Sequence, residues 1–306
     1  MLNYPIGDSN GFLRKKFNML MLNKTVIVTG SNSGIGKYSA IELCRMGAHV
    51  VMACREIAYG NEKSVFDVME EIKASVPNAQ LSFIPLDLSS FESIRHFVSQ
   101  FNQKHNRLDV LLNNAGVVCL DKRKSVDGFE LTMCVNHLGP FLLTNLLLDV
   151  LIKTPGARVV NVSSKAHMKG KIKFSGNTIK ERRPYRGLIT YADSKLANIY
   201  FTQELAERLR DHKVTVNALH PGGVASNIWP DSKGVIGMIR RKIVKNLKKP
   251  EQGASTSIYL CTSPEVEGVS GKYFYKKKQI NPHKRAKKAD LQKKFWQVSA
   301  ACTGLG

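Results

Sequence analysis

Tyr191 and Lys195 are the residues whose types and spacing best suit proton transfer in this sequence. On a helix, positions four residues apart lie on one face, so the phenol and the ammonium would point into the same space. A free phenol has a pKa of about 10, too high for effective acid–base catalysis at neutral pH. A neighbouring cation favours the phenolate and can lower this pKa by about one to three units. The pair therefore predicts a tyrosine acid–base group, although the same spacing is common on exposed helix surfaces.

A glycine-rich turn with the spacing G-x-x-x-G-x-G lies between a β-branched run at residues 25–29 and a predicted helix at 35–46. Glycines in such a turn let backbone N–H groups approach a pyrophosphate at the helix N-terminus. The flanking strand and helix favour this interpretation over a plain loop. The residues expected to bind the dinucleotide here are Gly30, Ser31, Asn32, Ser33, Gly34, Ile35 and Gly36.

The end of the second apolar run indicates which dinucleotide is bound. An acidic residue at that point would hydrogen-bond the ribose 2′-hydroxyl of NAD, whereas this sequence has Cys54 followed by Arg55. A guanidinium suits a 2′-phosphate, because arginine recognises phosphate through paired N–H groups. The neighbouring Glu56 argues for NAD, and a solvated surface arginine is a further alternative. We take Arg55 to favour NADP(H).

The charge of the chain is strongly basic, with 46 Lys and Arg against 24 Asp and Glu, a formal net charge of +22. Such a field attracts anionic partners, whether a phosphorylated cofactor, an acidic membrane surface or nucleic acid. No aromatic interleaving or recognition module accompanies the charge, so we expect no nucleic-acid partner. Peripheral contact with an anionic membrane stays open beside a merely solvated basic face.

The cysteines and the lengths of the apolar runs exclude several classes of protein. The six cysteines include no CxxC pair and no His/Cys cluster at ligand spacing, which argues against a disulfide scaffold and a bound metal. No apolar run is long enough to span a bilayer, and residues 1–22 are expected to form a basic extension rather than a transmembrane segment. We expect a cytoplasmic protein, with a place at the periphery of an intracellular membrane left open.

Short apolar runs alternate with longer helical stretches along most of the chain. Strands this apolar are usually covered by helices on both faces, as in a parallel sheet with crossover helices. The pattern predicts an α/β fold: a single doubly wound (Rossmann) domain over residues 23–280, with a mostly parallel seven-stranded sheet and a basic C-terminal extension at 281–306. The predicted strands are 25–29, 49–53, 81–86, 108–112, 157–162, 214–219 and 271–275, and the predicted long helices are 129–152 and 191–211.

The order of the motifs is similar to that of the short-chain dehydrogenase/reductase superfamily over about residues 23–278. After the glycine turn come NNAG following the fourth strand, Asn136 in a helix, Ser163-Ser164 following the fifth strand, and the Tyr–Lys pair. The resemblance implies catalytic roles for Asn136, Ser164, Tyr191 and Lys195. Of the two serines, Ser164 matches the family position, and Ser163 would point to the opposite side of an extended strand.

The same resemblance implies further contacts with the cofactor. Asp87-Leu88 would border the adenine, the NNAG segment would support the sheet and the cofactor, and the segment that begins at Pro221 would bind the nicotinamide end. These implied cofactor-binding residues are Asp87, Leu88, Asn114, Ala115, Gly116, Tyr191, Lys195, Pro221, Gly222, Val224 and Ser226.

A closer resemblance is to the retinol-dehydrogenase-like branch, carried by TGSNSGIGK, MACRE, VNHLGPFLLT, VNVSSKAH and YADSKLAN. It implies an oxidoreductase that interconverts a small-molecule carbonyl (a lipophilic, retinal-like aldehyde or ketone) and an alcohol, and Arg55 makes NADP(H) the expected cofactor. An NAD-dependent alcohol dehydrogenase, a cofactor-binding scaffold with little activity and a basic membrane adaptor are the alternatives. The two long helices leave a homodimer open.

Overall fold

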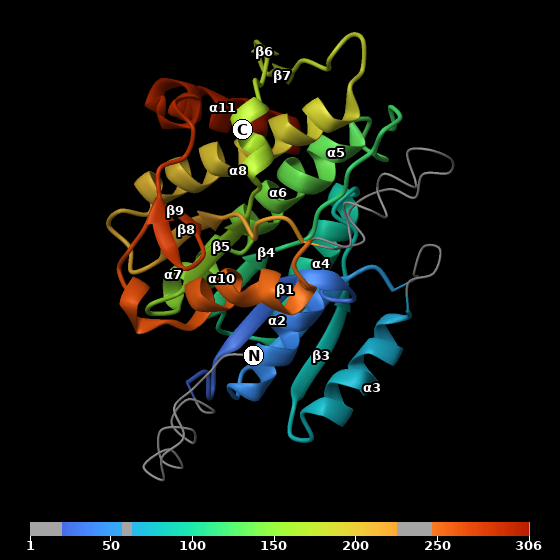
Figure 1. The fold of residues 1–306 in the computed structure, drawn as a ribbon, viewed down its shortest axis with the longest axis vertical. Helices are drawn as coiled ribbons and strands as arrows, with labels where there is room; N and C mark the ends of the chain where they lie inside the picture. The colour runs from blue at the N-terminus through green and yellow to red at the C-terminus, as the bar shows by residue number, and fades with distance from the viewer. Residues whose placement is uncertain (1–19, 57–62, 225–246, 306) are drawn as a thin grey trace.

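The computed structural model describes residues 20–56, 63–224 and 247–305. A central sheet with the strand order β10-β9-β8-β5-β4-β1-β2-β3 runs through the molecule (Figure 1). All neighbouring strands pair in parallel except β9 and β10, which form an antiparallel hairpin. The strands are β1 (Thr25–Thr29), β2 (His49–Cys54), β3 (Gln80–Pro85), β4 (Val110–Asn113), β5 (Arg158–Val162), β8 (Thr215–Leu219), β9 (Tyr273–Tyr275) and β10 (Lys278–Ile280).

The predicted Rossmann fold is confirmed, but the predicted number of strands is wrong by one. The sheet has eight strands because the chain reverses at Lys276 and Lys277, which have positive φ angles of 50° and 63°, and then pairs β10 with β9. Two consecutive left-handed residues are typical of a tight hairpin turn, where glycine or asparagine is the usual signal. The lysines in these positions gave no such signal.

Helices cover both faces of the sheet, and the side chains of β1 show how. Val26 and Val28 face a core shared with helices α2 (Gly34–Arg45) and α10 (Pro250–Thr262). Ile27 faces a second core shared with α4 (Phe91–Lys104), α6 (Gly139–Leu146) and α8 (Gly187–Arg208). Alternate residues of a strand point to opposite faces, so an entirely apolar strand must be covered twice. The helices are α2 (Gly34–Arg45), α3 (Val65–Ser75), α4 (Phe91–Lys104), α6 (Gly139–Leu146), α7 (Leu148–Lys153), α8 (Gly187–Arg208) and α10 (Pro250–Thr262).

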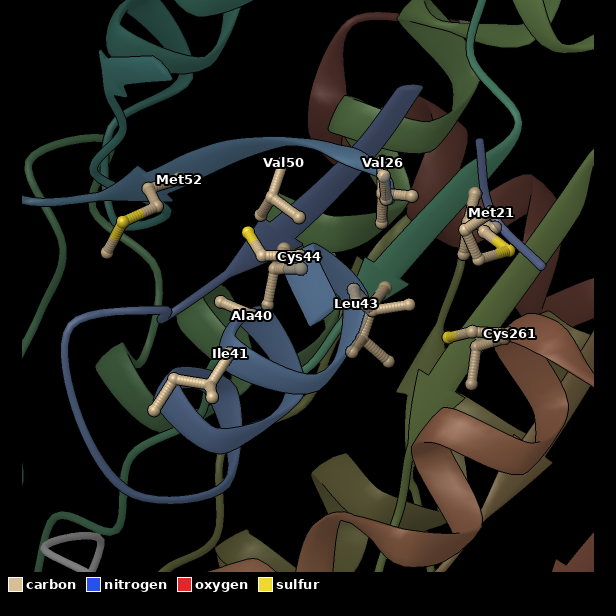
Figure 2. Close-up of a cluster of buried hydrophobic side chains, with 14 of the residues drawn as sticks. Met21, Val26, Ala40, Ile41, Leu43, Cys44, Val50, Met52 and Cys261 are labelled. Atoms are coloured by element: carbon tan, nitrogen blue, oxygen red, sulfur yellow. The ribbon is translucent and has the colours of Figure 1, made fainter. Parts of the chain in front are cut away.

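Figure 2 shows the first of these cores around α2. Val26 and Val50 come from neighbouring strands, Leu43 from α2 and Cys261 from α10, and all four side chains are buried. Burial of each large apolar side chain contributes about 1.5–3 kcal/mol. This core therefore fixes the start of α2 at the end of β1, where the glycine turn lies.

The helix predicted over residues 129–152 is broken in the structure. A short α5 (Leu131–Met133) leads into the π-helical turn η1 (Cys134–Leu138), and α6 and α7 follow in succession. Gly139 presses against β3–α4 connecting residues, since a Cβ there would lie 2.5 Å from the Leu88 carbonyl oxygen. Single π-helical turns inside α-helices often occur at functional sites, and this one contains Asn136.

Further helices and short strands lie outside the alternating strands and helices of the Rossmann fold. Helix α11 (Ala289–Thr303) packs along α8 (Figure 1), where the Trp296 ring stacks on Phe201 and lies 4.4 Å below the Arg208 guanidinium. Across the described residues, none of the helices combines the length and the apolar character needed to cross a membrane. The remaining short elements are η2 (Lys165–Lys169), β6 (Phe174–Ser175), β7 (Thr178–Ile179), η3 (Pro264–Val266) and η4 (Lys284–Lys287).

Candidate active site

The glycine turn lies between β1 and α2, as the spacing predicted. Gly30 and Gly34 have positive φ angles of 63° and 53°, a conformation that residues with a Cβ rarely adopt. A Cβ at Gly36 would lie 2.1 Å from the Gly30 carbonyl oxygen, so only glycine allows the turn to close on itself. Ser31, Asn32 and Ser33 form the rest of the turn, and Ile35 contacts the α10 side, close to Gly253.

Polar contacts tie this turn to the NNAG segment at the end of β4. The Thr29 hydroxyl accepts hydrogen bonds from the backbone N–H groups of Asn114 (2.9 Å) and Ala115 (3.0 Å). The Asn114 side-chain amide donates to the Thr29 carbonyl oxygen (2.9 Å). Gly116 continues this half-buried segment. The two segments therefore form one rigid corner. Thr29, for which no role was predicted, is its central residue.

The corner fits the phosphates of a dinucleotide. Helix α2 starts with no side-chain cap from Ser33 and no acidic residue in its first turn, so its N-terminal N–H groups and positive dipole end suit an anion. The Ser31 hydroxyl is buried and lacks a hydrogen-bond partner within the part of the chain that is described. A buried hydroxyl without a partner is unfavourable in a folded protein and indicates that a ligand group belongs nearby.

The proposed adenine side of the site lies at the ends of β2 and β3. Arg55 is exposed directly after β2, whose Ala53 carbonyl oxygen accepts a hydrogen bond from the Gly30 N–H (2.8 Å). Asp87 is half-buried and accepts from the Ser89 N–H and hydroxyl (2.8 and 2.7 Å). The buried Leu88 follows it. Arg55 and Asp87 thus follow neighbouring strands, β2 and β3, on the same side of the glycine turn.

The segment expected at the nicotinamide end begins directly after β8. Pro221 is half-buried, Gly222 has a positive φ of 88°, and Val224 is buried and forms an isolated parallel bridge to Lys248. Ser226, the last residue predicted here, lies outside the described residues.

Tyr191 and Lys195 lie one turn apart in α8, and both side chains are buried. The Lys195 ammonium lies 5.6 Å from the centre of the Tyr191 ring and donates a 3.0 Å hydrogen bond to the Val162 carbonyl oxygen. Val162 ends β5, so this contact fixes the helix at the carboxyl edge of the sheet. The carboxyl ends of parallel strands are where ligands bind in doubly wound folds.

Burial controls the protonation of both groups. It raises the pKa of Tyr191 to about 12, a shift that a hydrogen bond with Ser164 only partly opposes. Burial also lowers the pKa of Lys195 from 10.5 to about 8. The phenol pKa is therefore raised, opposite to the lowering expected from the lysine, because loss of hydration is the largest influence on it.

The two serines after β5 point in different directions. The Ser163 hydroxyl donates to the Lys195 backbone carbonyl oxygen (2.7 Å), so this serine binds the backbone of α8. The Ser164 side chain instead contacts the Tyr191 phenol and accepts from the Ala166 N–H (3.1 Å), capping η2. Ser164 is thus the serine that shares a site with Tyr191.

Asn136 lies in the π-helical turn and is almost fully buried. Its amide donates to the Val117 carbonyl oxygen (2.9 Å) and to the Ser194 hydroxyl (3.0 Å), and its carbonyl accepts from the Val117 N–H (2.8 Å). Both N–H groups are used, so only one lone pair of its carbonyl oxygen is left for a water. The side chain mainly ties the Val117 loop to α8.

His167 is a positioning residue that the sequence analysis did not identify. It accepts from the His283 N–H at Nε2 (3.1 Å), so Nδ1 carries the proton and donates to the Ser164 carbonyl oxygen (2.7 Å). The Tyr273 hydroxyl lies 3.3 Å from the same Nδ1. This buried contact attaches the residue after β5 to the C-terminal segment, a long-range pairing that local spacing cannot reveal.

Comparison with known proteins places this fold and site in a family. The sequence profile of the short chain dehydrogenase family matches residues 24–233. The chain is 42% identical to Retinol dehydrogenase 14 of Homo sapiens over 301 residues, covering 94% of this chain and 88% of that protein. It is 40% identical to Retinol dehydrogenase 13 of Homo sapiens over 290 residues, covering 92% and 85% of the two chains.

Solved structures agree. The crystal structure of an uncharacterized protein from Mycobacterium paratuberculosis has a TM-score of 0.70 and 30% identity, covering 92% of this chain and 94% of that chain. A short chain dehydrogenase from Salmonella enterica serovar Typhi has a TM-score of 0.64 and 25% identity, covering 84% and 97% of the two chains.

The chain therefore belongs to the short-chain dehydrogenase family. Within that family it is a member of the retinol-dehydrogenase-like branch, which confirms the resemblance drawn from its motifs. It is a nucleotide-binding oxidoreductase.

Proposed function

We propose that this protein is an NADP(H)-dependent oxidoreductase that interconverts a lipophilic aldehyde or ketone and the corresponding alcohol. The observation that carries the proposal is the contact of Tyr191 with Ser164 and Lys195 at the carboxyl edge of β5. A bound nicotinamide would supply the hydride for the carbonyl carbon, or take it up from the alcohol. The chain itself must then move one proton to or from the substrate oxygen.

Tyr191 is the proposed proton donor in the reductive direction. A phenol whose pKa is raised to about 12 is protonated at neutral pH and is a weaker acid than a free phenol. It can still supply the proton on reduction, because the substrate oxygen becomes a stronger base than the phenolate as hydride reaches the carbonyl carbon. Ser164 already contacts this phenol, and its hydroxyl would hold the substrate oxygen beside it. Lys195, with a pKa of about 8, can return a proton to the phenolate near physiological pH.

NADP(H) is the proposed cofactor because of Arg55. This exposed guanidinium follows β2 beside the glycine turn, where a 2′-phosphate of the adenosine ribose would need a cation. The N–H groups of the turn and of the α2 N-terminus would hold the pyrophosphate. Asp87 and Leu88 would border the adenine, and residues 221–226 would border the nicotinamide.

A lipophilic substrate is supported by the names of the relatives, which are retinol dehydrogenases. Two apolar residues of the segment between η2 and α8, Ile172 and Phe174, pack against a buried core cluster rather than forming a pocket, and the ring centres of Phe174 and Phe295 lie 5.9 Å apart. The substrate class is therefore best found by experiment. Aldehydes and ketones of increasing apolar length, assayed with NADPH by loss of its absorbance, should show turnover that rises with length.

Replacement of Tyr191 tests the proposed chemistry directly. Tyr191→Phe removes only the hydroxyl, so NADPH should still bind while carbonyl reduction falls by about 10²- to 10⁴-fold. Tyr200→Phe is the matched control on the same helix, because its hydroxyl donates to the Arg285 carbonyl oxygen away from the site. Full activity of Tyr191→Phe on a substrate that the wild type reduces would refute the assignment.

Replacement of Arg55 tests the cofactor. Arg55→Ala should raise the KM for NADPH by about tenfold, the loss of roughly 1.4 kcal/mol of phosphate binding, and leave the KM for NADH unchanged. Arg210→Ala, which removes an exposed arginine paired with Glu207 at the far end of α8, serves as the charge control. An equal change in both KM values would assign Arg55 to general folding rather than to phosphate recognition.

A further inference from the structure

A second concave site lies in the segment between η2 and α8, apart from the glycine turn and the Tyr191 site. It is a pocket of about 250 Å³ that borders the short β6–β7 hairpin and the start of α8. Most of its wall is cationic. The lining residues are Lys171, Lys173, Lys180, Glu181, Arg182, Arg183, Pro184, Arg186 and Asp193.

Among the described residues, only one of the six cations in this wall has a carboxylate partner. Arg182 forms a two-pronged ion pair with the buried Asp193, with N–O distances of 2.6 and 2.9 Å. The second carboxylate, Glu181, pairs instead with Lys122 outside the pocket (2.5 Å). The five other cations, all exposed, have no carboxylate at salt-bridge distance among the described residues: Lys171, Lys173, Lys180, Arg183 and Arg186.

The start of α8 adds to the same field. This 22-residue helix begins at Gly187, and its N-cap is the pocket residue Arg186, which offers no side-chain acceptor. The first turn of α8 contains no acidic residue, so the positive end of the helix dipole is not compensated within the helix. Five like charges and a helix N-terminus around one cavity repel one another, and an anion between them would relieve that repulsion.

We propose that this pocket, termed here the basic pocket, binds a phosphate group, either on a small soluble phosphate ester or on the headgroup of a lipid. Several converging cations in a cavity of this volume favour a compact, multiply charged anion over a single carboxylate. The Arg182–Asp193 pair closes one side of the pocket and leaves the five remaining cations to the ligand. The proposal does not depend on the oxidoreductase chemistry, because none of the wall residues contacts substrate or cofactor in that scheme.

Thermal unfolding with inorganic phosphate tests binding in the basic pocket. At constant ionic strength, phosphate should raise the Tm of the full chain, since a ligand that binds only the folded state stabilises it. The triple variant Lys173→Gln, Lys180→Gln, Arg183→Gln, termed here the basic-pocket variant, should bind phosphate at least about tenfold more weakly than the wild type by titration calorimetry. The variant loses only repulsive charges, so its Tm without phosphate should equal or exceed that of the wild type.

A matched variant distinguishes the effect of the pocket on phosphate binding from the effect of the net charge of the protein. This variant, termed here the lysine control, lacks three exposed lysines outside the pocket: Lys284→Gln, Lys288→Gln, Lys293→Gln. It should keep the phosphate affinity of the wild type. The phosphate site of the glycine turn is intact in both variants, so it cannot produce a difference between them. Equal phosphate affinity of the wild type and the basic-pocket variant would overturn the proposal.

Vesicles distinguish the two sources of the phosphate. Phosphatidylcholine vesicles that contain phosphatidic acid should sediment the wild type and the lysine control but not the basic-pocket variant, if the ligand is a lipid headgroup. Binding of inorganic phosphate without sedimentation identifies a soluble ester. Sedimentation of all three proteins alike, together with equal phosphate affinity, identifies a diffuse surface charge effect and contradicts a specific pocket.

Discussion

Two cations are held at α8 in opposite ways. Lys195 is buried with a carbonyl oxygen as its polar partner, and burial lowers its pKa to about 8. Arg182 reaches α8 from the preceding segment and pairs with Asp193, and this hydrogen-bonded pairing raises the pKa of the guanidinium. The two α8 residues involved, Asp193 and Lys195, are separated by one position in the sequence.

The Arg182–Asp193 pair and Lys195 differ in whether the charge has a carboxylate partner, and this difference indicates which of them is structural and which is functional. A buried charge is stable only when it is paired, so Arg182 and Asp193 hold the segment before α8 in place. Lys195 lacks such a carboxylate partner among the described residues, and its ammonium is therefore easy to deprotonate. We infer that the first region stabilises the fold, and that the second sacrifices stability for a group able to exchange protons near neutral pH.

Breaking the Arg182–Asp193 pair should have the largest effect on stability. Arg182→Met leaves the buried Asp193 carboxylate with the Lys171 N–H as its remaining hydrogen-bond partner, and should lower the free energy of unfolding by about 3 kcal/mol. Denaturant unfolding at pH 7 measures this change. The matched control is Arg45→Met, which breaks an exposed pair with Glu42 and should change stability by less than about 1 kcal/mol.

A double replacement sharpens this test. Arg182→Met combined with Asp193→Leu removes both charges, and should recover most of the stability lost in the single variant. If the single variant is as stable as the wild type, the pair is not structural and the contrast with Lys195 fails.

Removal of Lys195, which has no carboxylate partner among the described residues, should increase the free energy of unfolding. The change should be smaller than that caused by breaking the Arg182–Asp193 pair. Lys195→Met removes a buried ammonium and should raise the free energy of unfolding at pH 7 by about 2 kcal/mol while it abolishes turnover. The folded pKa lies below the unfolded one, so the unfolded chain binds more protons between pH 8 and 10.5. The stability of the wild type should therefore rise through that range, and the advantage of the variant should shrink.

The outcome that contradicts this view is a less stable Lys195→Met protein. It would mean that the hydrogen bond to Val162 contributes more than burial of the charge removes. Lys37→Met is the control, because this lysine pairs with Glu71 at the surface and its removal should not stabilise the protein.

The fold could be predicted from the sequence because it depends on local patterns. The apolar runs around Val26–Val28 and Val159–Val160 need cover on both faces, and this requirement gives the parallel sheet directly. Strand β10 was missed because its three residues are exposed and its turn is formed by Lys276 and Lys277. Pairing with a neighbour, rather than apolar burial, makes it a strand.

The site was predictable where the backbone defines it and unpredictable where long-range contacts do. The glycine turn and the Tyr191–Lys195 spacing are local features, so their positions follow from the sequence. The roles of Thr29 and His167 depend on partners about 85 and 116 positions away, which no motif encodes. The protonation of Tyr191 was missed for the same reason, because spacing reveals a nearby cation but not the depth of burial.

His137 provides the smallest and most specific test of the contrast, because it is another buried basic group that, like Lys195, has no carboxylate partner among the described residues. Its Nε2 contacts the Ser299 hydroxyl (2.8 Å), its ring stacks on Phe295, and burial lowers its pKa to about 3. Since the unfolded histidine has a pKa of about 6.5, the unfolded chain binds more protons between pH 6.5 and 3. The contribution of His137 to stability is therefore complete above pH 6.5 and should fall by about 1 kcal/mol per pH unit below it.

The variant His137→Gln keeps a polar contact with Ser299 but cannot take up this proton. Urea unfolding at several pH values between 4 and 7 should show a shallower loss of stability for this variant than for the wild type, with some loss remaining because burial also lowers the pKa of His220 to about 4. The exposed His96→Gln should retain the full slope. A His137→Gln protein with the wild-type slope would show that the buried imidazole is already charged, and would contradict the conclusion that unpaired basic groups in this core remain neutral or easily deprotonated.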